Sequence, residues 1–315
     1  MKPKVIAVVG PTSSGKTSLG IYLAKKLGGE IISADSRQVY RGLDIGTGKV
    51  TKKEMQGVPH HLLDVANPKK PWPGGQFSAD DFVRRGTQAI RGMIYHTSPV
   101  IPIVVGGTGF YIDTLLGRMN IPPVPPNPAL RARLEKKSVA QLFAMLKKID
   151  PRRERSIEPR HKRRLIRAIE IAQGGNPKAE RRTWAVEAEG EAEGLPPEAK
   201  YEILWLGLNP GAKKLKENIH KRLVACMKSG MIVEAKKLRR AGLSYKRMEE
   251  LGLEYRYLAL YLQGKLTRAQ MLEQLERAIN KYAKRQMRWF KRNKDIRWVA
   301  GKTEALTLAK KFISR

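Results

Sequence analysis

Cysteine is almost absent from this 315-residue sequence, in which Cys226 is the only one. A single thiol excludes an internal disulfide and favours a reducing compartment such as the cytoplasm. No apolar run approaches the roughly 20 residues that a membrane-spanning helix needs. The N-terminus enters a strand pattern directly, so we expect no signal peptide, and we expect no membrane as a partner.

Acidic residues are scarce relative to basic ones. The chain has 29 Asp and Glu against 62 Lys and Arg, which gives a formal net charge of +33. An excess of this size indicates a large polyanionic partner, and nucleic acid is the partner that best fits it. The alternative is a self-repelling basic protein without such a partner, but the charge is clustered along the chain rather than spread evenly.

Strand and helix patterns alternate in the first part of the chain. Short apolar runs that end at glycine or aspartate predict strands, and amphipathic runs predict helices, one of them with Ser78 as N-cap and Asp81 in its first turn. The predicted strands cover residues 4–9, 30–34 and 99–105, and the predicted helices cover residues 17–27 and 77–95. This order is typical of an α/β fold with a parallel sheet flanked by helices.

The composition changes after Gly117. Residues 121–128 contain five prolines, which predicts an extended, hinge-like segment. Basic helices are predicted at 129–148 and 162–172, an exposed linker at 187–200, and a strand at 201–208, with mostly helical structure beyond it. In the last long helix, Thr267–Gln270 fits a capping box, and the stripe formed by Leu272, Leu275, Ile279 and Tyr282 is expected to be core.

A phosphate-binding loop follows the first predicted strand. The segment matches G-x-x-x-x-G-K-[ST] at every fixed position and precedes a predicted helix, as the motif requires. Its residues are Gly10, Pro11, Thr12, Ser13, Ser14, Gly15, Lys16 and Thr17. Backbone N–H groups and the helix N-terminus would surround a phosphate, Lys16 would neutralise it, and Thr17 could hold Mg²⁺. The fold is therefore predicted to contain a P-loop NTPase-like core.

The strand that would carry the metal-binding acid of a kinase or ATPase lacks that acid. Residues 101–105 are followed by Gly106-Gly107-Thr108, whereas Asp35 ends another strand and Asp64 is the next candidate. We therefore expect the loop to hold a diphosphate without splitting a phosphoanhydride. A small-molecule or nucleotide kinase and a non-catalytic RNA-binding protein with a vestigial P-loop are the competing interpretations. The histidines have no metal-ligand spacing, so zinc is not expected.

Four further segments complete a pattern that covers nearly the whole chain. They are the run from Asp35 to Lys49, Pro59-His60-His61-Leu62-Leu63-Asp64, the run from Val105 to Ile112, and Ala283-Lys284-Arg285-Gln286-Met287-Arg288-Trp289-Phe290. Together with the P-loop, and in this order, they resemble the motifs of the tRNA dimethylallyltransferases, also called the tRNA isopentenyltransferase family.

The resemblance implies a fold and an activity. It implies a catalytic core from residues 1–117 and 201–315 and an inserted helical, tRNA-binding domain at 118–200. It implies transfer of a dimethylallyl group from dimethylallyl diphosphate to the exocyclic amine of the adenosine 3′ of the anticodon in tRNA, with release of pyrophosphate and help from Mg²⁺. It also implies a monomer. Whether the donor is plain or hydroxylated, and which tRNAs are modified, stays open.

The same resemblance implies roles for individual residues. Asp35 would be the general base, with a helix cap or metal ligand as the alternative. Thr108 would hydrogen-bond the leaving oxygen or place the base, with a simple turn residue as the alternative, and Arg222 would neutralise the leaving group. The residues implied to contact tRNA are Asp35, Ser36, Arg37, Gln38, Arg131, Arg163, Arg164, Leu165, Ile166 and Arg167.

Two basic segments and three departures from the family pattern complete the analysis. Residues 152–167 and 284–297 each carry a net charge of +6, which suits RNA binding, although Trp289 and Phe290 in the second could instead be core. Asn218 stands where an arginine is common, Val224 where an aspartate is common, and residues 250–256 replace a Gly-Tyr form.

Overall fold

The computed structural model describes residues 2–69, 77–98, 100–174 and 201–315. These residues form two compact units. The first contains residues 2–69, 77–98, 100–116 and 201–315, and the second contains residues 117–174. The predicted linker at 187–200 lies outside the described residues. Among the helices in these ranges, none is long and apolar enough to cross a membrane.

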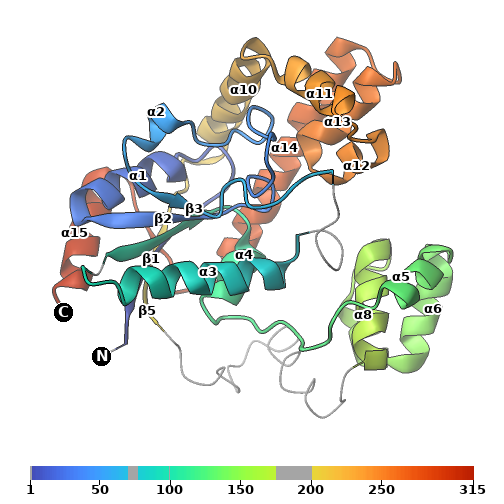
Figure 1. Ribbon diagram of the computed structural model, residues 1–315, viewed down its shortest axis with the longest axis horizontal. Helices are drawn as coiled ribbons and strands as arrows, with labels where there is room; N and C mark the ends of the chain where they lie inside the picture. Colours follow the sequence, from blue (N-terminus) through green and yellow to red (C-terminus); the bar gives the residue numbers. More distant parts are fainter. Residues whose placement is uncertain (1, 70–76, 99, 175–200) are drawn as a thin grey trace. The chain divides into compact units, whose positions relative to one another are not determined.

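A six-stranded parallel sheet forms the centre of the first unit (Figure 1). Its order is β3-β2-β4-β1-β5-β6, and the register places Gly106 beside both Ala34 and Val9, and Val9 beside Gly207. The strands are β1 (Lys4–Val9), β2 (Gly29–Ala34), β3 (His60–His61), β4 (Ile101–Gly106), β5 (Glu202–Gly207) and β6 (Arg297–Trp298). Because β1, β2, β4 and β5 end at the same level of the sheet, the loops that follow them meet at one edge. Ligands bind at this edge in open α/β sheets.

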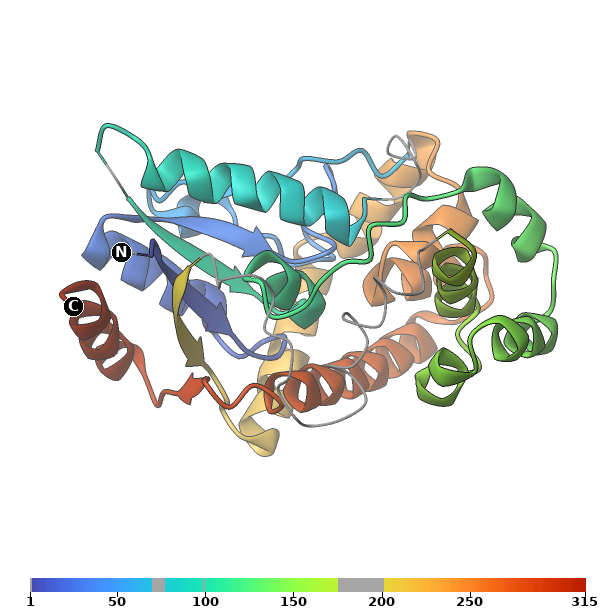
Figure 2. The same cartoon turned by 90° about the horizontal axis from the view of Figure 1, so that it is seen from below.

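Helices cover both faces of the sheet. The side chains of β1 alternate, so Val5, Ala7 and Val9 belong to one core cluster and Ile6 and Val8 to the other. The first face packs against α3 (Ala79–Ile94) and α4 (Gly109–Leu115), and the second packs against α1 (Lys16–Leu27) and α15 (Lys302–Ile313). Figure 2 shows α3 and α15 on opposite sides of the strands. The α/β class and the predicted strands and helices of this region are confirmed, with bounds shifted by one or two residues.

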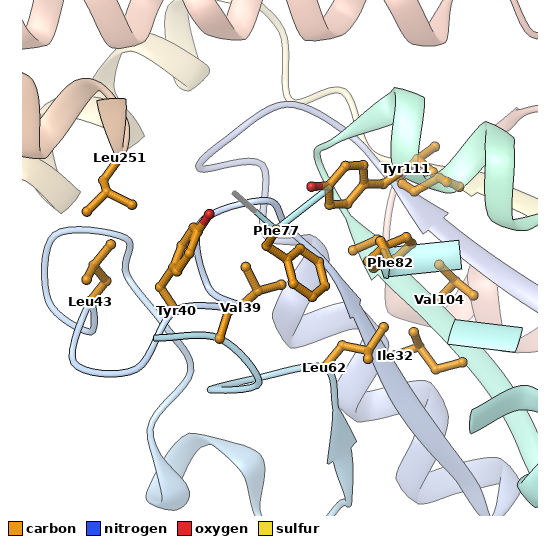
Figure 3. Packing of buried hydrophobic residues seen from close by; sticks show 14 of the residues in the cluster. Ile32, Val39, Tyr40, Leu43, Leu62, Phe77, Phe82, Val104, Tyr111 and Leu251 are labelled. Carbon is orange, nitrogen blue, oxygen red and sulfur yellow. The ribbon is translucent and has the colours of Figure 1, made fainter. Parts of the chain in front are cut away.

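The core on the α3 side extends beneath the loop that follows β2 (Figure 3). Phe82 and Tyr111 stack with their ring centroids 4.5 Å apart. Val39, Tyr40 and Leu43 are buried in the same cluster and reach toward Leu251. The loop carrying Asp35 and its neighbours is therefore held by apolar packing as well as by its own hydrogen bonds.

The rest of the first unit is mainly helical. After the short α2 (Lys52–Met55), the later helices are α10 (Ala212–Lys228), α11 (Met231–Arg240), α12 (Tyr245–Glu250), α13 (Leu253–Leu262) and α14 (Arg268–Phe290). The predicted capping box of Thr267 and Gln270 starts α14. Leu275 and Ile279 of the predicted stripe are buried, whereas Leu272 and Tyr282 are only half-buried.

The second unit is a small helical cluster. It consists of α5 (Pro128–Glu135), α6 (Val139–Ile149), α7 (Pro151–Ser156) and α8 (Lys162–Gly174). The prediction of one helix over residues 129–148 is wrong, because α5 ends at Glu135 and a second helix begins after Ser138. Ser138 and Gln141 form a capping box, and its S-x-x-Q spacing is visible in the sequence.

Glu170 is the buried charged residue of this unit, with 2% of its surface exposed. It accepts two hydrogen bonds from Arg131, at 2.9 and 2.8 Å, one from the Asn127 N–H at 2.6 Å, and another from Arg167. Burial raises the pKa of the Glu170 carboxyl, but the hydrogen bonds from Arg131, Asn127 and Arg167 outweigh it and hold the pKa below its usual value. The carboxylate therefore ties α8 to the start of α5.

Replacing Glu170 with glutamine should destabilise this unit by about 2 kcal/mol, because two arginines lose a charged acceptor in a buried position. The measurement is amide hydrogen exchange in α5 and α8 of the full-length chain. Glu158→Gln is the matched control, because Glu158 lies 3.8 Å from Arg164 and both side chains are exposed. An equal gain in exchange for the two variants would contradict the role given to Glu170.

Candidate active site at the strand ends

The P-loop connects β1 to α1 in a conformation that requires glycine. Gly10 and Gly15 have φ values of 154° and 92°, and Ser13 also has a positive φ of 61°. A Cβ on Gly10 would lie 2.7 Å from the Leu208 carbonyl oxygen and 2.8 Å from Ser14 Oγ. A side chain at position 10 would therefore push the loop away from β5 as well as strain it.

Two side chains of this loop are suited to binding an anion. Ser14 Oγ is buried and, within the described residues, has no hydrogen-bond partner. Lys16 Nζ donates to the Pro11 carbonyl oxygen at 3.0 Å. Burial lowers the pKa of Lys16 to about 8, with Asp35 opposing that shift and Arg222 adding to it. Together with the N-terminus of α1, these groups form a site for phosphate oxygens.

Gln286 of α14 locks the P-loop against the end of β4. Its Oε1 accepts from the Thr12 N–H at 2.8 Å, and its Nε2 donates to the Gly107 carbonyl oxygen at 2.8 Å. Sequence reasoning placed Gln286 in a family motif but gave it no role. Its position on the buried side of a long amphipathic helix was the available signal, since a buried amide needs polar partners.

Arg222 and Asn218 bring α10 to the same loop. Arg222 donates to Thr12 Oγ1 at 3.1 Å and to the Thr47 carbonyl oxygen at 2.6 Å. Asn218 donates to the Ser13 carbonyl oxygen at 3.1 Å, so this departure from the family pattern still contacts the P-loop. Val224, another departure from the family pattern, has a side chain that is 39% exposed.

Asp35 and Thr108 lie side by side at the ends of β2 and β4. Thr108 Oγ1 accepts from the Ser36 N–H at 3.2 Å, and the Thr108 N–H donates to the Ala34 carbonyl oxygen at 3.3 Å. Asp35 Oδ1 accepts from the N–H groups of Arg37 and Gln38, at 2.8 and 3.4 Å. One oxygen of Asp35 thus caps the following turn, while within the described residues Oδ2 accepts no hydrogen bond.

Two residues of this site were missed by sequence reasoning. Tyr282 hydrogen-bonds the Thr108 side chain, and burial together with the charge of Asp35 raises its pKa to about 12. Glu254 faces Arg222, Asp35 and Arg37, and burial raises the pKa of its carboxyl. The predicted core stripe on α14 therefore also supplies a site residue, Tyr282. The segment 250–256, which departs from the family pattern, supplies the Glu254 carboxyl.

A small, mostly apolar pocket adjoins the P-loop and Arg222. Its lining is Thr12, Ser13, Gly46, Ile219, Arg222, Leu223, Cys226, Met231, Glu254 and Ile279. Phosphate-binding groups and an apolar pocket thus lie side by side, which suits a ligand with a charged head and a short hydrocarbon tail.

The predicted tRNA contacts beside Asp35 are half-buried. Arg37 donates to the Glu250 carbonyl oxygen at 3.2 Å, and Gln38 donates to the Gly48 carbonyl oxygen at 3.3 Å. The Ser36 N–H is engaged by Thr108. These residues shape the wall of the site next to Asp35.

In the second unit, the predicted tRNA contacts divide into exposed and buried side chains. Arg163 and Arg164 are exposed, whereas Leu165 and Ile166 are 0% and 4% exposed. The side chains of Leu165 and Ile166 hold α8 in its core and are not available to RNA. Arg131 and Arg167 are half-buried and engaged by Glu170.

The basic segment 284–297 mixes core and surface. Phe290 is buried, as the core interpretation expected. Trp289 donates through Nε1 to Asp113 at 2.7 Å, and the Arg292 guanidinium lies 4.0 Å from its ring centroid. The basic residues of this segment are exposed at the surface.

The fold and the site define a P-loop protein in which the phosphate-binding loop lies beside an apolar pocket, with an acid and a hydroxyl at the neighbouring strand ends. The family model described as IPP transferase matches residues 38–293. The chain belongs to this family.

Similar proteins cover nearly its full length. A protein of Citrifermentans bemidjiense named tRNA dimethylallyltransferase 2 is 39% identical over 99% of this chain and 96% of that protein. A tRNA dimethylallyltransferase of Halalkalibacterium halodurans is 37% identical over 95% of this chain and 91% of the relative.

Solved structures share the fold. The tRNA isopentenylpyrophosphate transferase of Bacillus halodurans matches with a TM-score of 0.69 and 33% identity over 99% of this chain and 96% of its own. A eukaryotic dimethylallyltransferase acting on tRNA matches with a TM-score of 0.80 and 25% identity over 99% of this chain and 80% of its own.

The lowered pKa of Lys16 predicts that affinity for a diphosphate ligand falls as pH rises above about 8. Below that pH the lysine is already protonated, whereas above it binding must take up a proton, which costs up to about ten-fold in affinity per pH unit. Calorimetric titration with inorganic diphosphate between pH 6.5 and 9.5 measures this. Lys16→Arg is the control, because arginine stays charged throughout. The same profile for both proteins would remove Lys16 as the titrating group.

Proposed function

We propose that this protein transfers a dimethylallyl group from dimethylallyl diphosphate to the exocyclic amine of the adenosine 3′ of the anticodon in tRNA. The observation that carries the proposal is the meeting of three features at one sheet edge. These are a P-loop whose buried Ser14 hydroxyl has no hydrogen-bond partner among the described residues, an apolar pocket beside Arg222, and Asp35 next to Thr108, which binds the Ser36 N–H. The relatives' names supply the donor and the acceptor.

The P-loop would hold the diphosphate as a leaving group. When the bond between C1 of the donor and its bridging oxygen breaks, negative charge grows on that oxygen and departs with the diphosphate. Lys16, Arg222 and the backbone N–H groups at the start of α1 would stabilise this charge. The apolar cavity lining, with Ile219, Leu223 and Met231, favours a plain dimethylallyl tail over a hydroxylated one.

Asp35 would act as the base. The adenine amine is a poor nucleophile because its lone pair is delocalised into the ring, so its proton must leave as the new C–N bond forms. Oδ2 is the oxygen available for that proton, because Oδ1 caps the turn at Arg37 and Gln38. Thr108 fixes the backbone beside Asp35 through the Ser36 N–H and so keeps the carboxylate in position.

The chemistry of the donor set fits a Mg²⁺ that is carried mainly by the substrate. Magnesium sites of this kind use one or two protein ligands together with phosphate oxygens and water. Thr17 follows Lys16 directly, and its side chain is exposed. Within the described residues, no group of three or more His, Cys, Asp or Glu side chains could hold a metal by itself. When bound, Mg²⁺ would neutralise part of the diphosphate charge, with Thr17 as its protein ligand.

The basic surface supports tRNA as the acceptor. The net charge of +33 gives an electrostatic attraction for phosphates, and the Arg163 and Arg164 side chains are exposed at the surface. An anticodon-loop base would have to leave its stack to reach Asp35, and RNA loops allow this at low cost. We also propose that the protein acts on tRNA as a monomer in the cytoplasm.

The direct test is incubation with dimethylallyl diphosphate, Mg²⁺ and unmodified tRNA, followed by mass spectrometry of the nucleosides. A prenylated adenosine is the expected product. ATP consumption without such a product would indicate the kinase, and tRNA binding with neither reaction would indicate the RNA-binding protein.

Asp35→Ala should slow transfer by about 100-fold or more, which is the scale of losing a general base. The affinity for tRNA should stay within a few-fold, because a single carboxylate contributes little to phosphate contacts. Rates come from single-turnover assays and affinities from filter binding. Thr97→Ala, at an exposed position, serves as the control. An unchanged rate for Asp35→Ala would remove this residue from the base role.

A further inference from the structure

Glu234 of α11 is bound to the loop between Leu43 and Lys49. Its Oε2 accepts from the Asp44 and Ile45 N–H groups at 3.0 and 2.7 Å, and its Oε1 accepts from the Gly46 N–H at 3.1 Å. Three successive backbone N–H groups thus converge on one carboxylate, an arrangement that fixes the backbone around an anion.

Tyr255 of α13 completes this cluster. Its hydroxyl donates to Glu234 Oε1 at 2.6 Å, and its side chain is fully buried. The ring also lies against Gly46, where a Cβ would come within 2.9 Å of it. Tyr255 belongs to the segment 250–256, which also supplies Glu254 to the site.

The held loop in turn positions Arg222. The Thr47 carbonyl oxygen accepts from Arg222 Nη2 at 2.6 Å. At Gly48, where φ is 57°, a Cβ would lie 2.2 Å from Arg222 Nη2, so the guanidinium lies directly against the backbone. The Thr47 hydroxyl donates to the Leu43 carbonyl oxygen at 2.6 Å, which closes the turn from inside.

We propose that Glu234, completed by the Tyr255 hydroxyl, is a positioning residue that holds residues 44–48 so that Arg222 meets the leaving diphosphate. Glu234 lies outside the lining of the cavity and acts only through the loop. A carboxylate suits this task because it accepts from three N–H groups and a hydroxyl at once, whereas an amide presents one acceptor and one donor. The inference rests on the proposed function, since it assigns a partner to the arginine of that reaction.

The test is a double-mutant cycle on the donor step. Glu234→Gln should lower kcat/KM for dimethylallyl diphosphate about ten-fold at saturating tRNA, because Arg222 loses its fixed acceptor. The Kd for tRNA should stay within about two-fold. Tyr255→Phe, which removes one hydroxyl and keeps the charge, should lower the same parameter about three-fold. The Tyr255→Phe variant keeps the test informative if the Glu234→Gln variant does not fold.

The decisive comparison is made in an Arg222→Ala background. There, either second substitution should change kcat/KM by less than about two-fold, because the residue being positioned is gone. Glu276→Gln is the matched control, since Glu276 accepts from His220 of α10 at 3.0 Å without touching Arg222. If Glu234→Gln or Tyr255→Phe lowered kcat/KM by the same factor with and without Arg222→Ala, the proposal would be overturned. Wild-type protein that makes no prenylated tRNA would instead refute the proposed function.

Discussion

The P-loop is the constraint on which the rest of this structure depends. Its backbone turns so sharply that Gly10 and Gly15 take positive φ angles. Three side chains from the C-terminal half support it, namely Gln286, Arg222 and Asn218. Since they come from α10 and α14, the site exists only once the C-terminal helices pack against the sheet.

This arrangement explains how a nucleotide-binding type of loop can serve chemistry at carbon. The acid, Asp35, lies at the end of β2 and not at the end of β4. The end of β4 carries Gly106-Gly107-Thr108, whose glycines let its backbone approach that of β2. A Cβ on Gly106 would lie 2.2 Å from the Ala34 carbonyl oxygen, so glycine is needed to bring Thr108 beside Asp35. The acid and hydroxyl therefore lie next to the phosphate loop, where they can serve an acceptor while the loop holds the leaving group.

Local patterns were sufficient to predict the α/β core, the P-loop and the position of Asp35, because each depends on residues close in sequence. The break at Ser138 was predictable from its capping box but was overlooked. The roles of Gln286, Glu254 and Tyr282 were not predictable by periodicity, because their partners lie far away along the chain. Likewise, the burial of Leu165 and Ile166 depends on how α8 packs against α6, which a charge pattern does not reveal.

The central claim is that the P-loop holds a diphosphate that leaves from carbon. The most direct measurement uses dimethylallyl diphosphate labelled with ¹⁸O at the oxygen that joins C1 to the first phosphorus. The acceptor is tRNA, and both products are analysed by mass spectrometry. Cleavage between carbon and oxygen predicts that all of the label appears in the released diphosphate and that the prenyl group appears on adenosine. Label retained in a prenyl alcohol or a prenyl monophosphate would show cleavage at phosphorus and contradict the account.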